Sequence, residues 1–344
     1  MKTFIRPSGG GSGRASWLAS AALAATVAFT APQTAAAQPA HLTIASFSQG
    51  SSWYVYAVNL AELLREVLPA GSTIDTPPIA GGLANPQLVS GGKAQLGFGM
   101  AAVGNWALEG KIGYKEPLKN LRSLVGGLDD YFLVTLARGK GVPEDLSSYF
   151  TKVNPKAHVT LLSRGSIGSF AGQQMLELAG AGEKELAARG GNYEFGTFGM
   201  VKNRFAAGTG DIFVQVATRG HPGVSEIAHN SDVTFLAPSD ELLAKMRDQF
   251  GWDSKVLPKG TFKGQDKDVK VPGTTTVLFA STDLSDDNAY KIVKTVCEKT
   301  EKLRAAHKAL AKFDCANGSW KIGATGLPLH AGASRYYKER GWIK

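Results

Sequence analysis

The sequence predicts an α/β protein whose two lobes form a clamshell with a ligand cleft between them. The chain has 344 residues, more than one core of ordinary size uses, so two lobes are expected. Short strand-like segments alternate with longer helical segments, and this alternation occurs twice with different content. Ligands of such sheets bind beyond the carboxyl ends of the strands, which places the expected site in the cleft.

Residues 1–37 have the order of a secretory signal peptide. Lys2, Arg6 and Arg14 precede an apolar run, and Ala35-Ala36-Ala37 then fits the small-residue cleavage rule. A membrane anchor is the alternative, but about 17 mostly small residues are marginal for a hydrocarbon core of ~30 Å. We therefore expect cleavage near Ala37 and an exported, periplasmic chain.

Residues 38–138 are expected to form the first part of lobe one. The predicted elements are a strand at 42–45, a helix at 51–68, a strand at 72–75, a short helix at 85–89 and a strand at 95–98. The helix at 51–68 carries apolar residues near the 3.6-residue period. This βαβαβ order predicts right-handed crossovers and a mostly parallel sheet.

Residues 139–272 are expected to form lobe two, after an extended segment at 131–137. The predicted strands are 158–162, 193–198, 212–216 and 233–236, and the predicted helices are 168–179, 199–206, 221–229 and 239–249. Residues 258–273 are rich in Gly, Lys and Pro, which is typical of a surface loop. Residues 273–344 should complete lobe one with a return strand at 274–280, a long helix at 285–312 and the C-terminal tail.

The formal net charge is +9, of which three positive charges lie in residues 1–37, and the remaining charge of +6 favours solubility and attraction for acidic solutes. The Lys and Arg residues are dispersed rather than clustered with aromatic residues, so a nucleic-acid partner is not expected. The two cysteines, Cys297 and Cys315, fit one structural disulfide in an oxidising compartment. That bond requires the chain to double back after the helix that carries Cys297, because a straight helix would separate the two residues too far.

Two loops, one in each lobe, open a helix directly after a strand. Residues 46–52 and 163–169 are rich in small polar residues, and free helix N–H groups with the positive dipole end suit an anion such as a carboxylate. We expect Ser48 and Gln49 in the first loop, and Ser166 and Ser169 in the second, to contact the ligand. Plain N-capping by the serines is the alternative.

Further candidate binding residues lie near the ends of predicted strands. Arg164 and Arg219 are expected to hold a carboxylate through paired hydrogen bonds, unless solvent surrounds them. Gln215 and Thr218 should face the cleft beside Arg219. Met100 is expected to form pocket wall or core, and Tyr131 to stack at the cleft floor or to pack at the hinge.

Enzyme signatures are weak in this sequence. It has no G-x-S-x-G elbow and no phosphate-binding G-x-x-x-x-G-K-[ST] loop, and its six histidines show no metal-ligand spacing. We therefore expect no catalysis, cofactor or metal. A secreted hydrolase with dispersed catalytic residues is the remaining enzyme alternative.

The sequence resembles the TAXI class of TRAP-transporter solute receptors along nearly its whole length after the leader. The run 42–64, with Ser48-Gln49-Gly50 before Trp53-Tyr54, resembles the opening of that family. Gly81-Gly82 with Asn85 is similar to its second loop, and the segments 94–98 and 114–122 also resemble the family. The tail 328–341, including His330 and Tyr336, is the most specific match.

This resemblance implies a type II periplasmic binding protein fold that works with a TRAP permease on glutamate-like or dicarboxylate solutes. It also implies that Gly82 lies at the binding site. The chain departs from the family pattern at Gln95, where Asp is usual, at Met100-Ala101-Ala102 and at 166–169. These departures make one wall less polar and weaken the case for an amino acid, because an ammonium group needs acceptors. A binding protein of an ABC importer or a sensor is the nearer alternative.

Overall fold

The computed structural model describes residues 38–47, 49, 51–78 and 81–344. The strands of these residues are joined by hydrogen bonds into one branched sheet that runs through two α/β lobes. The predicted α/β fold of two lobes is confirmed. Because the predicted signal peptide at 1–37 lies outside the described residues, it stays a prediction.

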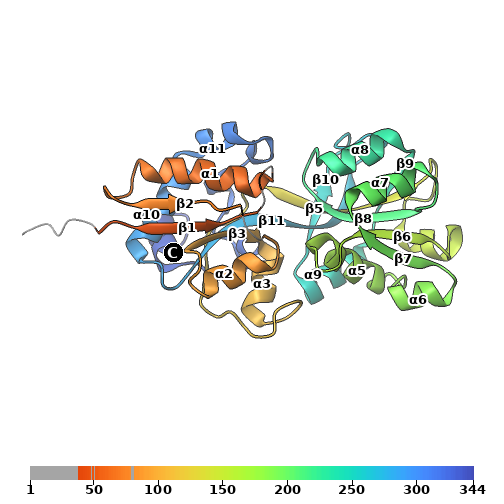
Figure 1. Ribbon diagram of the computed structural model, residues 1–344, viewed down its shortest axis with the longest axis horizontal. Helices are drawn as coiled ribbons and strands as arrows, with labels where there is room; N and C mark the ends of the chain where they lie inside the picture. The colour runs from red at the N-terminus through yellow and green to blue at the C-terminus, as the bar shows by residue number, and fades with distance from the viewer. Residues whose placement is uncertain (1–37, 48, 50, 79–80) are drawn as a thin grey trace, which may run out of the picture. The chain divides into compact units, whose positions relative to one another are not determined.

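Lobe one is built on a mixed sheet. β1 (His41–Ala45) pairs in parallel with β2 (Thr73–Asp75) and β3 (Leu96–Met100), whereas β11 (Val269–Ser281) is antiparallel to β3 and to β4 (Leu121–Val125). In Figure 1, α1 (Ser52–Arg65) and α11 (Thr300–Ala306) cover one face, and α2 (Ala84–Ser90) and α3 (Ala101–Glu109) cover the other. The remaining helices of the lobe are α10 (Asp286–Glu298), α12 (Ile322–Thr325) and α13 (Ala331–Glu339).

Lobe two has its own mixed sheet. β6 (His158–Leu162) is parallel to β7 (Asn192–Gly196) and β8 (Ile212–Ala217), and β5 (Asp130–Arg138) is antiparallel to β8 and to β9 (Val233–Leu236). In Figure 1, α7 (Phe198–Ala206) and α8 (Pro222–Asn230) cover one face, and α5 (Ile167–Leu178) and α9 (Asp240–Phe250) the other. The short helices are α4 (Leu146–Ser148) and α6 (Glu183–Ala188), with a π-helical turn at Tyr149–Val153.

The chain crosses between the lobes through two paired strands. Gly273, Thr274 and Thr275 of β11 lie opposite Phe132, Tyr131 and Asp130 of β5. Before this point β11 pairs with β10 (Asp253–Leu257) in lobe two, and after it β11 pairs with β3 and β4 in lobe one. One continuous strand therefore serves both sheets.

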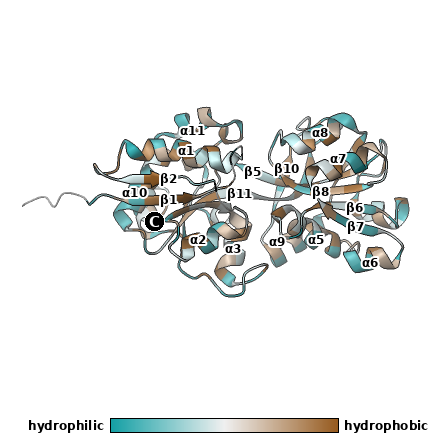
Figure 2. Cartoon of the chain, viewed as in Figure 1, coloured by the Kyte–Doolittle hydropathy of each residue, from teal (hydrophilic) through white to brown (hydrophobic). Residues whose placement is uncertain are grey.

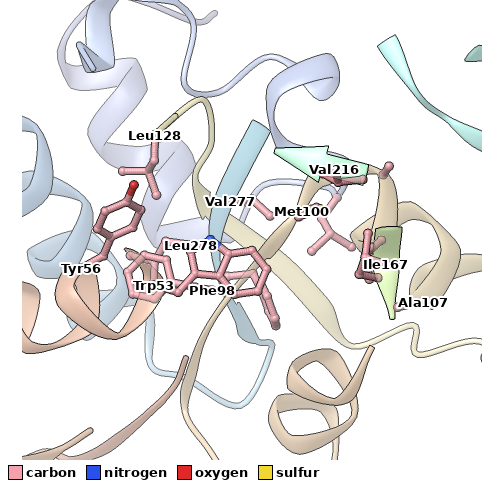
Figure 3. Close-up of a cluster of buried hydrophobic side chains, with 14 of the residues drawn as sticks. Trp53, Tyr56, Phe98, Met100, Ala107, Leu128, Ile167, Val216, Val277 and Leu278 are labelled. Carbon is pink, nitrogen blue, oxygen red and sulfur yellow. The ribbon is translucent and has the colours of Figure 1, made fainter. Parts of the chain in front are cut away.

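The buried hydrophobic residues form two cores. The larger core contains residues of both lobes, among them Met100, Ile167 and Val216, which Figure 3 shows as sticks. A smaller core lies within lobe two around Phe132, Phe213 and Phe235. Figure 2 shows brown mainly on the strands inside each lobe, whereas the helices outside them carry both teal and brown segments. The alternation of apolar and polar residues in the sequence produces this arrangement.

The structure corrects two predicted elements and adds two strands. Residues 258–273 are not a loop throughout, because β11 already begins at Val269 and extends the predicted return strand. The long helix at 285–312 is divided, since α10 ends at Glu298 and α11 ends at Ala306. β4 and β10 were not predicted. In β10 the residues before Leu257 are exposed or partly exposed, so they lack the apolar pattern of a buried strand.

The predicted disulfide is present between Cys297 and Cys315, with 18 residues of sequence separation. The chain doubles back after α11, and a short 3₁₀ turn at Cys315–Asn317 brings the second cysteine to the end of α10. Closing a loop of this length contributes about 3 kcal/mol by restricting the unfolded chain. No helix in the described part of the chain has both the length and the apolar character needed to span a membrane.

Candidate functional site

A cavity of about 640 Å³ lies between the lobes. Lobe one contributes the end of the loop after β1, the first turn of α1, the segment before α2 and the end of β3. Lobe two contributes the first turn of α5, the end of β8 and the first turn of α8. Strand ends and helix N-termini therefore meet here from both lobes, as expected for the ligand site of such a fold.

Two long helices begin at the cavity with capped N-termini. The hydroxyl of Ser51 accepts a hydrogen bond from the Tyr54 N–H at 3.2 Å and caps α1. In lobe two, the hydroxyl of Ser166 accepts from the Ser169 N–H at 3.2 Å and caps α5. The first turn of a helix still leaves backbone N–H groups without intrahelical acceptors, and its dipole is positive there. Both helices thus present positive ends to the cavity.

The lobe-one wall is aromatic and held by a hydrogen-bond network. The indole Nε1–H of Trp53 donates to the Thr276 hydroxyl at 3.0 Å, and its ring meets the Tyr131 ring edge-on with centroids 6.3 Å apart. Behind them, the buried Asp129 carboxylate accepts from the Tyr56 hydroxyl at 2.8 Å and from the Thr276 N–H at 3.2 Å. Burial raises the pKa of the Asp129 carboxyl to about 6. The network joins α1 to both crossing strands.

Phe47 and Met100 extend this apolar wall. Phe47 is 46% exposed and lies against Gly81, where a Cβ atom would collide with the phenylalanine ring. Gly81 also has a φ of +108°, which glycine adopts far more readily than other residues. Met100 ends β3 and is buried. Lobe one thus offers the ligand mainly rings and aliphatic surface.

The lobe-two wall contains an unsatisfied amide. The Gln215 side chain lines the cavity and is 8% exposed, and its Oε1 has no hydrogen-bond partner among the described residues. The amide lies against Gly168 in the first turn of α5, where any Cβ atom would collide with it. A buried polar atom without a partner is costly, and such atoms in folded proteins call for an explanation.

His221 adds a neutral polar group to the same wall. Its ring lines the cavity beside Phe198, with ring centroids 5.3 Å apart. Its Nδ1 accepts a hydrogen bond from the Val224 N–H at 3.5 Å, which assigns the proton of the neutral ring to Nε2. Loss of hydration lowers the pKa of His221 below its ordinary value, so the ring is uncharged at neutral pH.

The described residues that line the cavity include no Lys, Arg, Asp or Glu. The Arg164 guanidinium pairs with Glu183 at 2.7 Å and stacks on the Phe195 ring at 3.7 Å, outside the cavity. Arg219 lines a separate hollow of about 350 Å³, where its guanidinium lies 3.9 Å from the Asp130 carboxylate. The two arginines expected to clamp a carboxylate are therefore not brought together in this cavity.

The other predicted site residues divide into three groups. Those that line the cavity are Gly82, Met100, Tyr131, Ser166, Gln215 and Thr218. Gln49 is exposed and is not part of the lining, and Ser169 is buried with its hydroxyl donating to the Ser163 and Ser166 carbonyls. Ser48 lies outside the described residues. Ligand contact by these residues stays a prediction.

Sequence reasoning missed four apolar residues and one histidine of the cavity lining. Phe47, Trp53, Ile167, Phe198 and His221 all line it. Three of them, Trp53, Ile167 and Phe198, lie in the first turns of helices that follow strands. Their position in the sequence could therefore have indicated that they line the cavity. Aromatic and aliphatic residues there are read as core by default, because most of them are buried in packed interiors.

Comparison with known proteins identifies a matching family and several similar structures. The model of the NMT1-like family matches residues 44–341. A TctC solute binding protein from Polaromonas is similar in structure, with 11% sequence identity, a TM-score of 0.51, and coverage of 89% of this chain and 98% of that chain. MatC from Rhodopseudomonas palustris with bound malate has 14% identity, a TM-score of 0.48, and coverage of 88% and 97%. At 11% identity, the likeness to the Polaromonas protein concerns the fold.

Proposed function

This chain belongs to the NMT1-like family, and we propose that it is an exported receptor that captures a small solute between its lobes and delivers it to a membrane permease. The single observation that carries this proposal is the cavity of about 640 Å³ whose walls come from both lobes. A ligand bound there contacts two bodies joined by two strands. Such contacts favour the closed arrangement, which a permease can distinguish from the open one.

The geometry favours binding over catalysis. A hydrolase needs a nucleophile with a base in hydrogen-bond reach, and the base in turn needs an orienting group. The hydroxyls of Ser51 and Ser166 already accept hydrogen bonds from helix N–H groups, and His221 Nδ1 accepts from Val224. These groups are engaged in holding helix ends, which shapes a binding wall.

The proposed compartment and partner rest on the sequence. The leader at 1–37 supports export to the periplasm, and the resemblance to TAXI receptors, with the tail 328–341, supports a TRAP permease as the partner. The solute is proposed to carry a carboxylate, which the N-termini of α1 and α5 are suited to accept.

Native mass spectrometry of protein isolated from the periplasm tests the proposal. We expect a small molecule to accompany the folded chain and to be released on unfolding. Adding that molecule at about 100 times its Kd should stabilise the fold by about 2.7 kcal/mol in a thermal-shift assay. A chain that carries no small molecule, and that no member of a broad solute library stabilises, would contradict the receptor function.

Uptake assays identify the permease. Cells that lack the chain should lose uptake of the solute, and re-expression should restore it only when the TRAP permease subunits are present. Restoration through an ATP-driven importer instead would reject TRAP delivery while leaving the receptor function intact.

A further inference from the structure

We propose that the hollow beside Arg219 is a second binding site, which takes a small, doubly charged oxyanion of the sulfate or phosphate class. The hollow has a volume of about 350 Å³ and is separate from the interlobe cavity, although Thr218 lines both. Its lining comes from the segment 127–130 at the start of β5, the segment 308–313 after α11, and residues 218–220 after β8. This site goes beyond the proposed receptor function and does not depend on it.

Cationic side chains from both lobes line the hollow. Arg219 comes from lobe two, and Lys308 and Lys312 come from lobe one. In the described part of the chain, neither lysine forms an ion pair, and the Arg219 guanidinium has no hydrogen-bond acceptor. Positive charges around one hollow repel each other, and a bound anion relieves that repulsion. Because the cations belong to different lobes, such an anion also bridges the lobes and favours the arrangement in which the cations converge.

The carboxylates that line the hollow are already engaged. Asp130 Oδ1 accepts a hydrogen bond from the Lys255 ammonium at 2.7 Å, whereas Oδ2 lies 3.9 Å from the Arg219 guanidinium, beyond hydrogen-bond reach. The Asp129 carboxylate is buried and accepts the two hydrogen bonds of the lobe-one network. With Lys255 included, the cations around the hollow outnumber these carboxylates, so the hollow keeps a net positive charge at neutral pH.

The backbone holds Arg219 at the tip of a tight turn. The His221 N–H donates to the Thr218 carbonyl at 3.1 Å and closes this turn. Gly220 occupies the next position with a φ of +70°, which glycine adopts far more readily than other residues. The turn therefore fixes the point from which the Arg219 side chain reaches the hollow.

The lysines lie in a segment that the fold fixes at both ends. His307 Nδ1 accepts from the Ala309 N–H at 3.0 Å, and the 3₁₀ helix Lys308–Leu310 begins there. At the other end, the carbonyl of Phe313 accepts from Arg304 Nε–H at 2.7 Å, directly before the cysteine of the disulfide loop. The backbone under both lysines is thus held in place, and their flexible side chains can turn toward an anion.

The lining also determines which anion fits best. Its apolar residues Leu128 and Phe313 are 5% and 2% exposed, and low-dielectric walls of this kind focus the positive field on the hollow. A tetrahedral oxyanion presents oxygen atoms in all directions, so the planar fork of Arg219 can hold one edge while the lysine ammonium groups bind elsewhere. A single carboxylate carries less charge and offers only one edge.

Titration calorimetry of the unaltered protein with sodium sulfate tests the site, with sodium chloride keeping the ionic strength constant. We expect one saturable site with a Kd of about 1 mM or tighter, because several charge-assisted hydrogen bonds act together. Acetate should bind at least about fivefold more weakly, since it carries one charge. Saturation is the criterion because sulfate also stabilises folded proteins by exclusion from their surface, without any site. Absence of saturable sulfate binding would overturn the proposal, as would acetate that binds as tightly.

Two sets of variants locate the anion. Arg219→Gln should weaken sulfate binding by about tenfold or more, and so should Lys308→Gln combined with Lys312→Gln. The control combines Lys115→Gln with Lys119→Gln, which removes the same charge from exposed lysines of the same spacing outside the hollow. Its sulfate affinity should stay within about twofold, because salt screens distant exposed charges. Melting temperatures verify that all variants fold.

The remaining outcomes are equally decisive. If the control loses as much affinity as the hollow variants, sulfate responds to net charge and the site is rejected. If only the lobe-one or only the lobe-two variant weakens binding, the anion does not bridge the lobes and the interlobe site is rejected. A protein that captures a solute but binds no sulfate would keep the receptor function and lose this inference.

Discussion

The two walls of the interlobe cavity differ in how their polar groups are satisfied. On the lobe-one side, Trp53, Tyr56 and Asp129 form a closed network with Thr276, in which each donor has an acceptor. On the lobe-two side, the Gln215 amide oxygen is buried and has no partner among the described residues. The polar groups of the lobe-one wall are therefore satisfied within the protein, whereas the lobe-two wall keeps a buried oxygen that has no partner among the described residues.

The largest expected effect comes from breaking the lobe-one network at its centre. Asp129→Ala leaves the buried Tyr56 hydroxyl without its acceptor and leaves the Thr276 N–H only the main-chain carbonyl of residue 129 at 3.3 Å, which should lower the free energy of unfolding by about 3 kcal/mol. Denaturant titration measures this. The neighbouring Asp130→Ala is the control, because Asp130 is partly exposed and its pair with Lys255 should contribute under about 1 kcal/mol. Equal losses for both variants would contradict the assigned network.

A smaller loss is expected at the cavity face of the same network. Trp53→Phe keeps an aromatic ring but removes the Nε1–H that donates to Thr276, and it leaves a small void. We expect unfolding to become easier by about 2 kcal/mol from the lost hydrogen bond and packing together. Thermal unfolding followed by circular dichroism would show this. Unchanged stability would mean that Thr276 finds another donor.

The network also predicts a dependence on pH. The pKa of the folded Asp129 carboxyl is raised from 3.8 to about 6, so between these values the folded state binds more protons than the unfolded state. This contribution to stability therefore grows as the pH falls from 7 to 5, by about 1 kcal/mol, and fades as the pH rises through 6. Wild type should gain this amount relative to Asp129→Asn, which does not titrate. Parallel pH profiles for the two proteins would contradict the raised pKa.

The smallest effect, and one of opposite sign, is expected at Gln215. Gln215→Leu removes a buried oxygen without a partner, so the ligand-free protein should keep its stability or gain up to about 1 kcal/mol. Gln174→Leu is a matched control: both glutamines are 8% exposed, but Gln174 Oε1 accepts from the Trp252 indole at 2.9 Å. That variant should lose about 1 to 2 kcal/mol. Chemical denaturation of the pair tests the contrast between the walls directly.

The sequence predicted much of the fold because its periodicity is strong. The first helix at 51–68 and the strands of lobe two agree with α1, β6 and β8 to within a few residues. Chain order after a strand also located Met100, Gln215 and Thr218 at the cavity. The type and the position of helices and strands, which the spacing of apolar residues encodes, can thus be predicted from the sequence.

The charged residues were harder to place, for a physical reason. Arg164 lies just after the end of β6. Its long side chain turns toward Glu183 and Phe195, and only the tertiary fold brings these two residues close to it. Arg219 likewise reaches Asp130 in the separate hollow. The predicted helices and strands place the backbone of an arginine, but the direction of its flexible side chain depends on partners that are distant in the sequence.

The continuity of β11 has a consequence for the order in which the molecule can assemble during synthesis. Residues 269–281 supply the strand partner of β3 and β4 and pair with β5 and β10 as well. Until the ribosome has made them, β4 has no neighbouring strand and one edge of β3 stays open, although β1 and β2 are already complete. Nascent lobe one is therefore a surface that invites strand pairing with other chains. Holding the chain unfolded until its last quarter emerges would avoid that hazard.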